Sequence, residues 1–195
     1  MNVSSQRLRV LALFATFLPA WAWAHPADQA AHDAIAGMIH PFTGADHVLA
    51  MIAVGVWAAR LGRRASFTLP LVFPLMMLVG GWVASTGVAL PALEPTIAIS
   101  VITLGVLIAV GLRLPIFASA LLVAVFAIFH GYAHINESTG IAVGPYSAGF
   151  VMSTFVLHLL GLGIGAAMDR TKSRVLVRTS GSLIALAGSV LLLAA

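Results

Sequence analysis

The sequence predicts an all-α membrane protein, a bundle of six transmembrane helices that follows a cleavable signal peptide. Of its 195 residues, 61% are apolar and only 8% are charged, whereas a soluble domain carries about 25% charged residues. The mean hydropathy is +1.05, and the few charges separate long uncharged intervals that each have room for a span of about 20 residues. This composition excludes a soluble enzyme and a disordered chain.

The first segment is typical of a secretory signal peptide over residues 1–24. It has a basic start, a short apolar core and the small-x-small cleavage pattern Ala22-Trp23-Ala24. Cleavage would make His25 the first residue of the mature chain and would leave residues 25–195 as one six-helix transmembrane domain. The alternative is an uncleaved signal anchor, and in both cases the following segment starts outside the cytoplasm.

The six spans are placed by the uncharged intervals. The first must include Asp46, because the uncharged stretch from His47 to Ala59 is too short to cross a bilayer. Pro95 and Pro115 fall where helices begin, a position that tolerates a missing N–H. We expect the spans at about 41–60, 66–85, 96–112, 115–134, 146–168 and 176–194.

The basic residues predict the topology. With the mature N-terminus in the periplasm, the cytoplasmic loops are 60–65, 113–114 and 169–175, and the external segments hold no Lys or Arg after residue 25. By the positive-inside rule the chain therefore has this orientation in the membrane. The loops and their flanks hold Arg60, Arg63, Arg64, Arg113, Arg170, Lys172, Arg174 and Arg178.

Three plus three helices would suit an inverted repeat, a common plan in transporters, although the two halves show no clear sequence repeat. Small residues in the last two spans indicate close helix packing rather than chemistry. They are Gly161, Gly163 and Gly165 in the fifth span, and Gly181 and Gly188 in the sixth.

The polar residues at membrane depth suggest a metal site. The chain has no cysteine, so a site must use nitrogen, oxygen or a thioether. His130, His134 and Glu137 are four and then three residues apart, which places them on one helical stripe. Such a stripe suits a divalent cation, and the alternative is a helix end whose polar groups meet lipid headgroups.

A second group lies in the first span, where Asp46 and His47 are adjacent and His40 precedes His47 by seven residues. An ionisable group inside a membrane costs up to about 3 kcal/mol and needs a partner. That partner would be a cation, a histidine or a metal. The alternative is a hydrogen-bonded pair that locks the first helix to the fourth.

Three more histidines have candidate roles. His158 lies near the middle of the fifth span and would be either a relay below an outer site or a packed histidine. His25, with its free α-amine, and His32 would capture a divalent metal before the membrane, or would be incidental groups of the external segment.

These motifs resemble the HupE/UreJ family of hydrogenase- and urease-associated nickel permeases. The segment HPFTGADHVLAM at 40–51 is similar to the first motif of that family, and FHGYAHINE at 129–137 is similar to the second. The resemblance implies that six residues serve nickel transport, with cobalt or another divalent ion as alternative cargo. They are His40, Asp46, His47, His130, His134 and Glu137.

The function that this resemblance implies is import of Ni²⁺ from the periplasm across the bacterial inner membrane, for maturation of hydrogenase or urease. No G-x-x-x-x-G-K-[ST] loop occurs, so passage would be facilitated, or driven by the membrane potential or by protons. We expect no enzyme activity, no permanently bound cofactor and no nucleic acid partner. The expected partners are the lipid bilayer, the divalent metal and a metallochaperone or maturation protein. The alternatives are a non-transporting metal-binding accessory protein and an intramembrane metalloenzyme.

Overall fold

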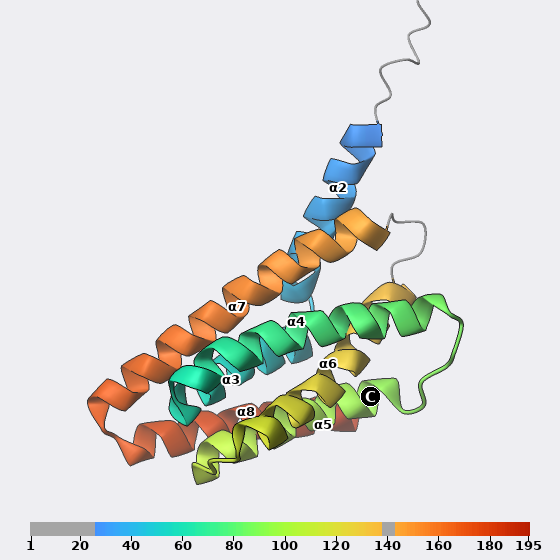
Figure 1. Cartoon of the computed structure of the whole chain (residues 1–195). Helices are drawn as coiled ribbons and strands as arrows, with labels where there is room; N and C mark the ends of the chain where they lie inside the picture. The colour runs from blue at the N-terminus through green and yellow to red at the C-terminus, as the bar shows by residue number, and fades with distance from the viewer. Residues whose placement is uncertain (1–25, 138–142) are drawn as a thin grey trace, which may run out of the picture.

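The computed structural model describes residues 26–137 and 143–195, apart from the side chains of residues 26–28 and Glu137, and its regular structure is entirely helical (Figure 1). The predicted signal peptide and His25 lie outside this part of the chain. The elements are α2 (Pro26–Ile39), the 3₁₀ helix η2 (His40–Phe42), α3 (Ala45–Leu61), α4 (Arg63–Ser85), α5 (Leu93–Val110), α6 (Ile116–Glu137), α7 (Val143–Thr171) and α8 (Arg174–Ala194).

The prediction of an all-α bundle of apolar spans is confirmed for these residues. Helices α4 to α8 are each long and apolar enough to cross a membrane, and α2 with α3 forms a sixth candidate that is bent by 78°. The predicted first span, 41–60, is wrong in its start. Since α3 has only 17 residues, it is about 25 Å long, less than the hydrocarbon core of about 30 Å.

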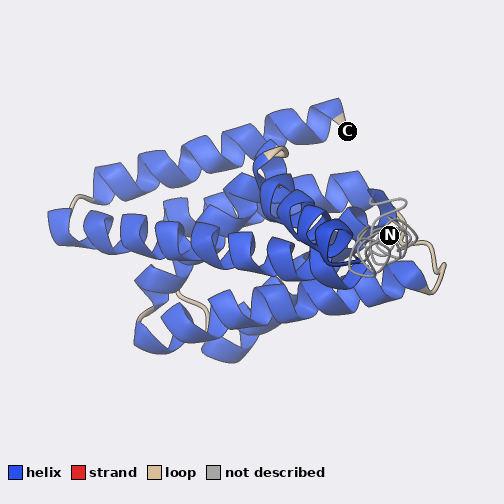
Figure 2. Cartoon of the chain, turned by 90° about the horizontal axis from the view of Figure 1, so that it is seen from above, coloured by secondary structure: helices blue, strands red, loops and turns tan. Residues whose placement is uncertain are grey.

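The helices associate in pairs along the bundle. Helix α3 packs along α7, α4 along α6, and α5 along α8, while α2 also packs against α7 (Figure 1). Seen from above, the C-terminal helix runs along one flank of the bundle (Figure 2). Trp57, Leu69, Phe73 and Leu104 are at most 1% exposed and form part of one apolar core.

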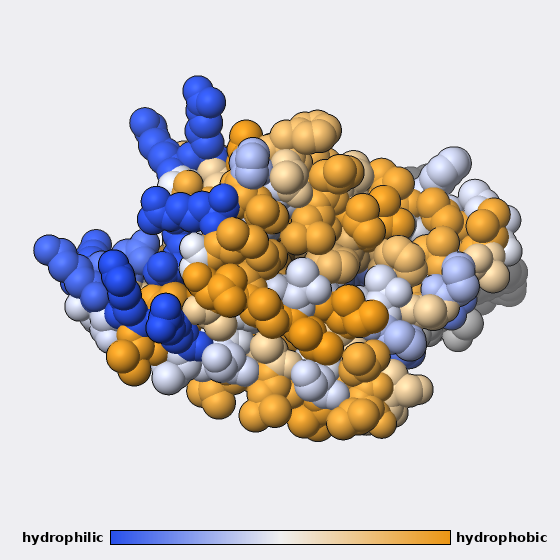
Figure 3. Space-filling view, turned by 90° about the horizontal axis from the view of Figure 1, so that it is seen from below, coloured by the Kyte–Doolittle hydropathy of each residue, from blue (hydrophilic) through white to orange (hydrophobic). Residues whose placement is uncertain are grey.

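The surface is apolar around the bundle and charged at one end. Phe67, Trp82, Phe117 and Leu193 are among the large apolar side chains that stay exposed, as expected where lipid replaces water. Hydrophilic side chains gather at one end of the face in Figure 3. The described chain has eight Lys and Arg residues, and all of them lie at the ends of α3, α5 and α7, just after these ends, or in the first turns of α4 and α8. The predicted segregation of basic residues to one end of the bundle is therefore confirmed.

Glycines set the distances between the paired helices. A Cβ on Gly161 or Gly165 would collide with the backbone of α3, and a Cβ on Gly181 or Gly188 would collide with α5. The predicted packing role is wrong for Gly163, which has nothing within 4 Å of an added Cβ. Residues two apart point to different sides of a helix, so Gly163 cannot share the face of its neighbours.

Exchange of Gly55 on α3 for Ala tests this packing. An added Cβ there would meet the backbone of His158 and Leu162 on α7, and such overpacking costs about 1–3 kcal/mol. We expect Gly55→Ala to lower the thermal unfolding midpoint of the purified protein in detergent. Gly163→Ala is the control, since it gains helix propensity in open space and should keep or raise the midpoint. Equal stability of the two variants would contradict this account.

Candidate metal centre

Four histidines from three elements meet at the end of the bundle opposite the basic residues. They are His40 of η2, His47 of α3, and His130 and His134 of α6. The ring centroids lie 4.8 Å apart for His40 and His134, 4.9 Å for His47 and His130, and 4.2 Å for His47 and His134. His47, His130 and His134 are at most 8% exposed, so these three side chains are buried in the bundle, whereas His40 is half-buried.

A break between η2 and α3 brings His40 and His47 to this cluster. Thr43 closes the 3₁₀ turn, because its backbone N–H and its hydroxyl both donate to the carbonyl of His40, at 3.0 and 2.7 Å. Gly44 then adopts an extended conformation and caps α3. A Cβ on Gly44 would lie 2.6 Å from Oδ1 of Asp46 and 2.9 Å from Nδ1 of His47. Glycine therefore makes room for this pair.

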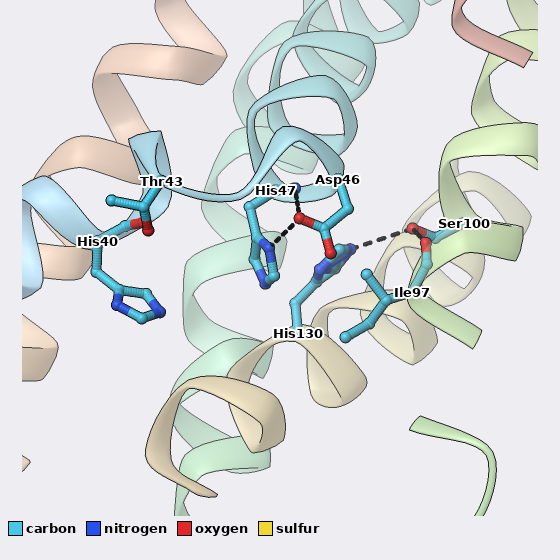
Figure 4. A network of polar contacts seen from close by, with 7 residues as sticks. All are labelled: His40, Thr43, Asp46, His47, Ile97, Ser100 and His130. Atoms are coloured by element: carbon cyan, nitrogen blue, oxygen red, sulfur yellow. Dashed lines mark hydrogen bonds and ion pairs between the residues drawn. The ribbon is translucent and has the colours of Figure 1, made fainter. Parts of the chain in front are cut away.

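Asp46 orients the ring of His47. Its Oδ1 accepts a hydrogen bond from the backbone N–H of His47 at 2.8 Å and lies 2.7 Å from Nδ1 of the same residue (Figure 4). A carboxylate beside Nδ1 holds the proton on that nitrogen and leaves the lone pair on Nε2. Nε2 of His47 is buried and has no hydrogen-bond partner among residues 26–137 and 143–195. These bonds join neighbours on α3, so they do not form the lock between the first and fourth spans that was the alternative interpretation of this pair.

Ser100 of α5 orients His130 in the same manner. Its hydroxyl donates to the carbonyl of Ile97 at 2.6 Å and lies 3.1 Å from Nε2 of His130 (Figure 4). Because the hydroxyl proton goes to Ile97, Ser100 accepts from Nε2–H, and the lone pair of His130 is left on Nδ1. Nδ1 of His130 is also buried without a hydrogen-bond partner.

His134 lies at the centre of the cluster. Its ring is close to those of His40 and His47 and lies 3.8 Å from that of Phe150 on α7. Both ring nitrogens of His134 are buried, and no described residue forms a hydrogen bond with either of them. In the neutral ring one of the two nitrogens always carries a lone pair. His134 can therefore bind a metal ion through that nitrogen without breaking an existing hydrogen bond.

The spacing of the rings suits a shared metal ion. Two imidazoles that bind one ion at about 2.1 Å and at right angles to each other have ring centres about 4.5 Å apart. The three measured separations lie between 4.2 and 4.9 Å. In the described part of the chain, no three His, Asp or Glu side chains already converge as a metal site, so shared binding requires the rings to rotate.

The remaining predicted residues lie apart from this cluster or outside the description. Glu137 is the last residue of α6, and its side chain is not described. His32 is exposed on α2, two turns before His40. His158 is fully buried on α7, where the ring of Phe73 lies 5.1 Å from it and 5.5 Å from that of His130.

Ser100, Phe73 and Phe150 contact the histidines and were not predicted. Ser100 is one of two hydroxyl residues near the centre of α5, with Thr103, and a hydroxyl at such a position signals a contact between helices in a membrane. The two phenylalanines carry no signal, because an aromatic residue in an apolar span is ordinary.

Comparison with known proteins agrees with the two motifs. The family described as HupE / UreJ protein matches residues 11–191. The chain is 40% identical over 181 residues to Protein HupE of Rhizobium leguminosarum bv. viciae, which covers 92% of this chain and 94% of that protein. No solved structure matches the chain.

Asp46→Asn tests whether the carboxylate serves His47. Asn keeps the shape and removes the charge that holds the proton on Nδ1, so we expect Ni²⁺ affinity of the purified protein to fall about 10–100-fold by calorimetry. Asp33→Asn is the control, since Asp33 is a buried acid on α2 that accepts from Gln29 at 3.1 Å. Wild-type affinity in Asp46→Asn would show that the carboxylate has no part in binding.

Proposed function

This chain belongs to the HupE/UreJ family of hydrogenase- and urease-accessory nickel and cobalt transporters, and from that premise we propose that it imports Ni²⁺ across the bacterial inner membrane. The ion passes from the periplasm to the cytoplasm, where a metallochaperone or maturation protein receives it for hydrogenase or urease. Co²⁺ is the alternative cargo, because imidazole donors suit both ions.

The buried ring nitrogens of the cluster carry this proposal. Within the described residues, Nε2 of His47, Nδ1 of His130 and both ring nitrogens of His134 have no hydrogen-bond partner. An unsatisfied buried polar group costs about 1–3 kcal/mol, so packing alone is a poor reason to gather several of them. A divalent metal would use these lone pairs, and neutral imidazoles bind Ni²⁺ without trapping it as a cage of thiolates would.

The charge distribution supports the direction. The cluster lies at one end of the bundle and the basic residues at the other, and by the positive-inside rule this favours a cluster on the periplasmic side. The membrane potential contributes about 2.3 kcal/mol per charge per 100 mV, or about 4.6 kcal/mol for a divalent cation. Inward movement therefore needs no nucleotide.

The family consists of transporters and accessory proteins and is not a known enzyme family, which favours transport over an intramembrane metalloenzyme. The accessory alternative requires binding without flux. Vesicles that contain only this protein distinguish the two, because a transporter accumulates the ion and an accessory protein holds at most its own equivalent.

Uptake of radioactive Ni²⁺ into such vesicles is the test. We expect wild-type protein to accumulate Ni²⁺ under an inward potential, and His47→Ala, His130→Ala and His134→Ala each to abolish uptake at limiting metal. Acid should slow wild-type uptake, because a protonated imidazole cannot bind metal. His32→Ala, a matched change outside the cluster, should keep the wild-type rate at saturating Ni²⁺.

Two results would contradict the proposal. Stoichiometric binding without accumulation would assign the chain to the accessory class. Normal uptake in a variant that combines His47→Ala with His134→Ala would separate transport from this cluster.

A further inference from the structure

The crossing of α3 and α7 has a reciprocal form. A Cβ on Gly55 of α3 would collide with the carbonyl of His158 on α7, and a Cβ on Gly161 of α7 would collide with the carbonyl of Ile52 on α3. Each glycine lies three residues after the residue whose carbonyl meets the opposite glycine. The two backbones are therefore in direct contact on both sides of the crossing.

The crossing of α4 and α6 has the same form. A Cβ on Gly131 of α6 would collide with the carbonyl of Met77 on α4, and a Cβ on Gly80 of α4 would collide with the carbonyl of Ile128 on α6. Here too each glycine follows the contacted residue by three positions. In this second crossing, α6 therefore corresponds to α3, and α4 corresponds to α7.

In the crossing of α5 and α8, the two helices make equivalent contacts with each other. A Cβ on Gly105 would meet the backbone of Gly181 and Ala185, and a Cβ on Gly181 would meet that of Gly105 and Ala109. The sequence reads GVLIA at 105–109 and GSLIA at 181–185. Both the sequence and the contacts therefore make α5 and α8 equivalent to each other.

Corresponding helices run in opposite directions. The basic pocket at one end, about 270 Å³ in volume, brings together Arg60 at the end of α3, Arg113 after α5, and Arg174 at the start of α8. Helix α6 also starts there, after Arg113. Such inverted halves are the plan of many transporters, in which two crevices alternate on either side of one site.

We propose that α3–α5 and α6–α8 form an inverted repeat, and that His158 lines a second, cytoplasm-facing crevice through which the divalent metal leaves. This inference rests on the proposed function and extends it to the exit route. Because Gly80 corresponds to Gly161 in the repeat, Met77 corresponds to His158. Each of these two residues lies three residues before its glycine.

The outer crevice is present in the structure. A hollow of about 560 Å³ lies between α4, α6 and α7, and Met77, Gly81, Trp82, His134 and Phe150 are part of its wall. It is largely apolar and reaches His134 of the histidine cluster. Met77, the counterpart of His158, therefore lines the outer crevice.

The corresponding inner position is packed. Ala58, Ala65 and Leu69, the counterparts of His134, Tyr146 and Phe150, are at most 3% exposed and belong to the core. The Ser66 hydroxyl of α4 also donates to the carbonyl of Ala58 on α3, at 3.4 Å. The structure thus has the outer crevice open and its inner counterpart closed.

His158 has the chemistry of an exit ligand. It is fully buried, and neither ring nitrogen has a hydrogen-bond partner in the described part of the chain. The ring of Phe73, itself 0% exposed, lies 5.1 Å from that of His158 and 5.5 Å from that of His130. If the α3–α7 crossing took the conformation of the α4–α6 crossing, and the α4–α6 crossing took that of α3–α7, the outer crevice would close and the inner one would open. His158 would then have access to the ion.

Cysteine labelling tests the second crevice, since the chain has no native cysteine. Ser147→Cys lines the outer crevice and Ser66→Cys occupies the counterpart position. An impermeant maleimide is added on the periplasmic side for position 147 and on the cytoplasmic side for position 66. We expect Ni²⁺ and an inward potential to lower the labelling of position 147 and to raise that of position 66. Thr171→Cys, exposed at the end of α7, should label from the cytoplasmic side in both conditions.

Labelling at position 66 that stays the same in both conditions would overturn the second crevice. Wild-type Ni²⁺ uptake is measured in vesicles from the same preparation. If the wild type transports and position 66 does not respond, only this inference fails, whereas absent wild-type uptake would contradict the proposed function itself.

His158→Ala tests the exit ligand. We expect this variant to lose most of its uptake rate while the purified protein keeps wild-type Ni²⁺ affinity, because the outer cluster is intact. Normal uptake would overturn the role of His158. Loss of binding together with uptake would also overturn it, since His158 would then belong to the outer site.

Discussion

Direct backbone contact between paired helices is the constraint on which the other features depend. In a membrane, helices gain little from burying apolar side chains, so close packing of small residues stabilises their association. Gly131 lies between His130 and His134, and its contact with the carbonyl of Met77 fixes how deeply both histidines enter the bundle. Gly55 likewise holds α3 against His158. The same contacts that stabilise the fold therefore place the imidazoles.

The chemistry of the cluster follows from which hydrogen bonds are made and which are left open. Asp46 and Ser100 each hold one nitrogen of a histidine, and in both cases the opposite nitrogen is buried without a partner. This arrangement is common around metal-binding histidines, where an outer partner fixes the tautomer and the ring orientation. It gives the site donors of defined protonation, which suits an ion that must bind and then leave.

The sequence predicted features that depend on local composition. Uncharged intervals located the spans to within a few residues, and the four-residue spacing predicted that His130 and His134 share a stripe. The break at Gly44 was missed because it depends on the fit of Asp46 and His47 against the turn. The GxLIA repeat at 105–109 and 181–185 was also missed, because the two halves share few other residues and only the contacts show their correspondence.

X-ray absorption spectroscopy of the purified protein with one equivalent of Ni²⁺ tests the central claim most directly, because it reports the ligands without requiring transport. The account predicts a nitrogen and oxygen shell with outer-shell scattering from at least two imidazoles, and fewer imidazoles in His47→Ala and in His130→Ala. A shell of water and carboxylate oxygens without imidazole scattering, or unchanged spectra in both variants, would contradict it.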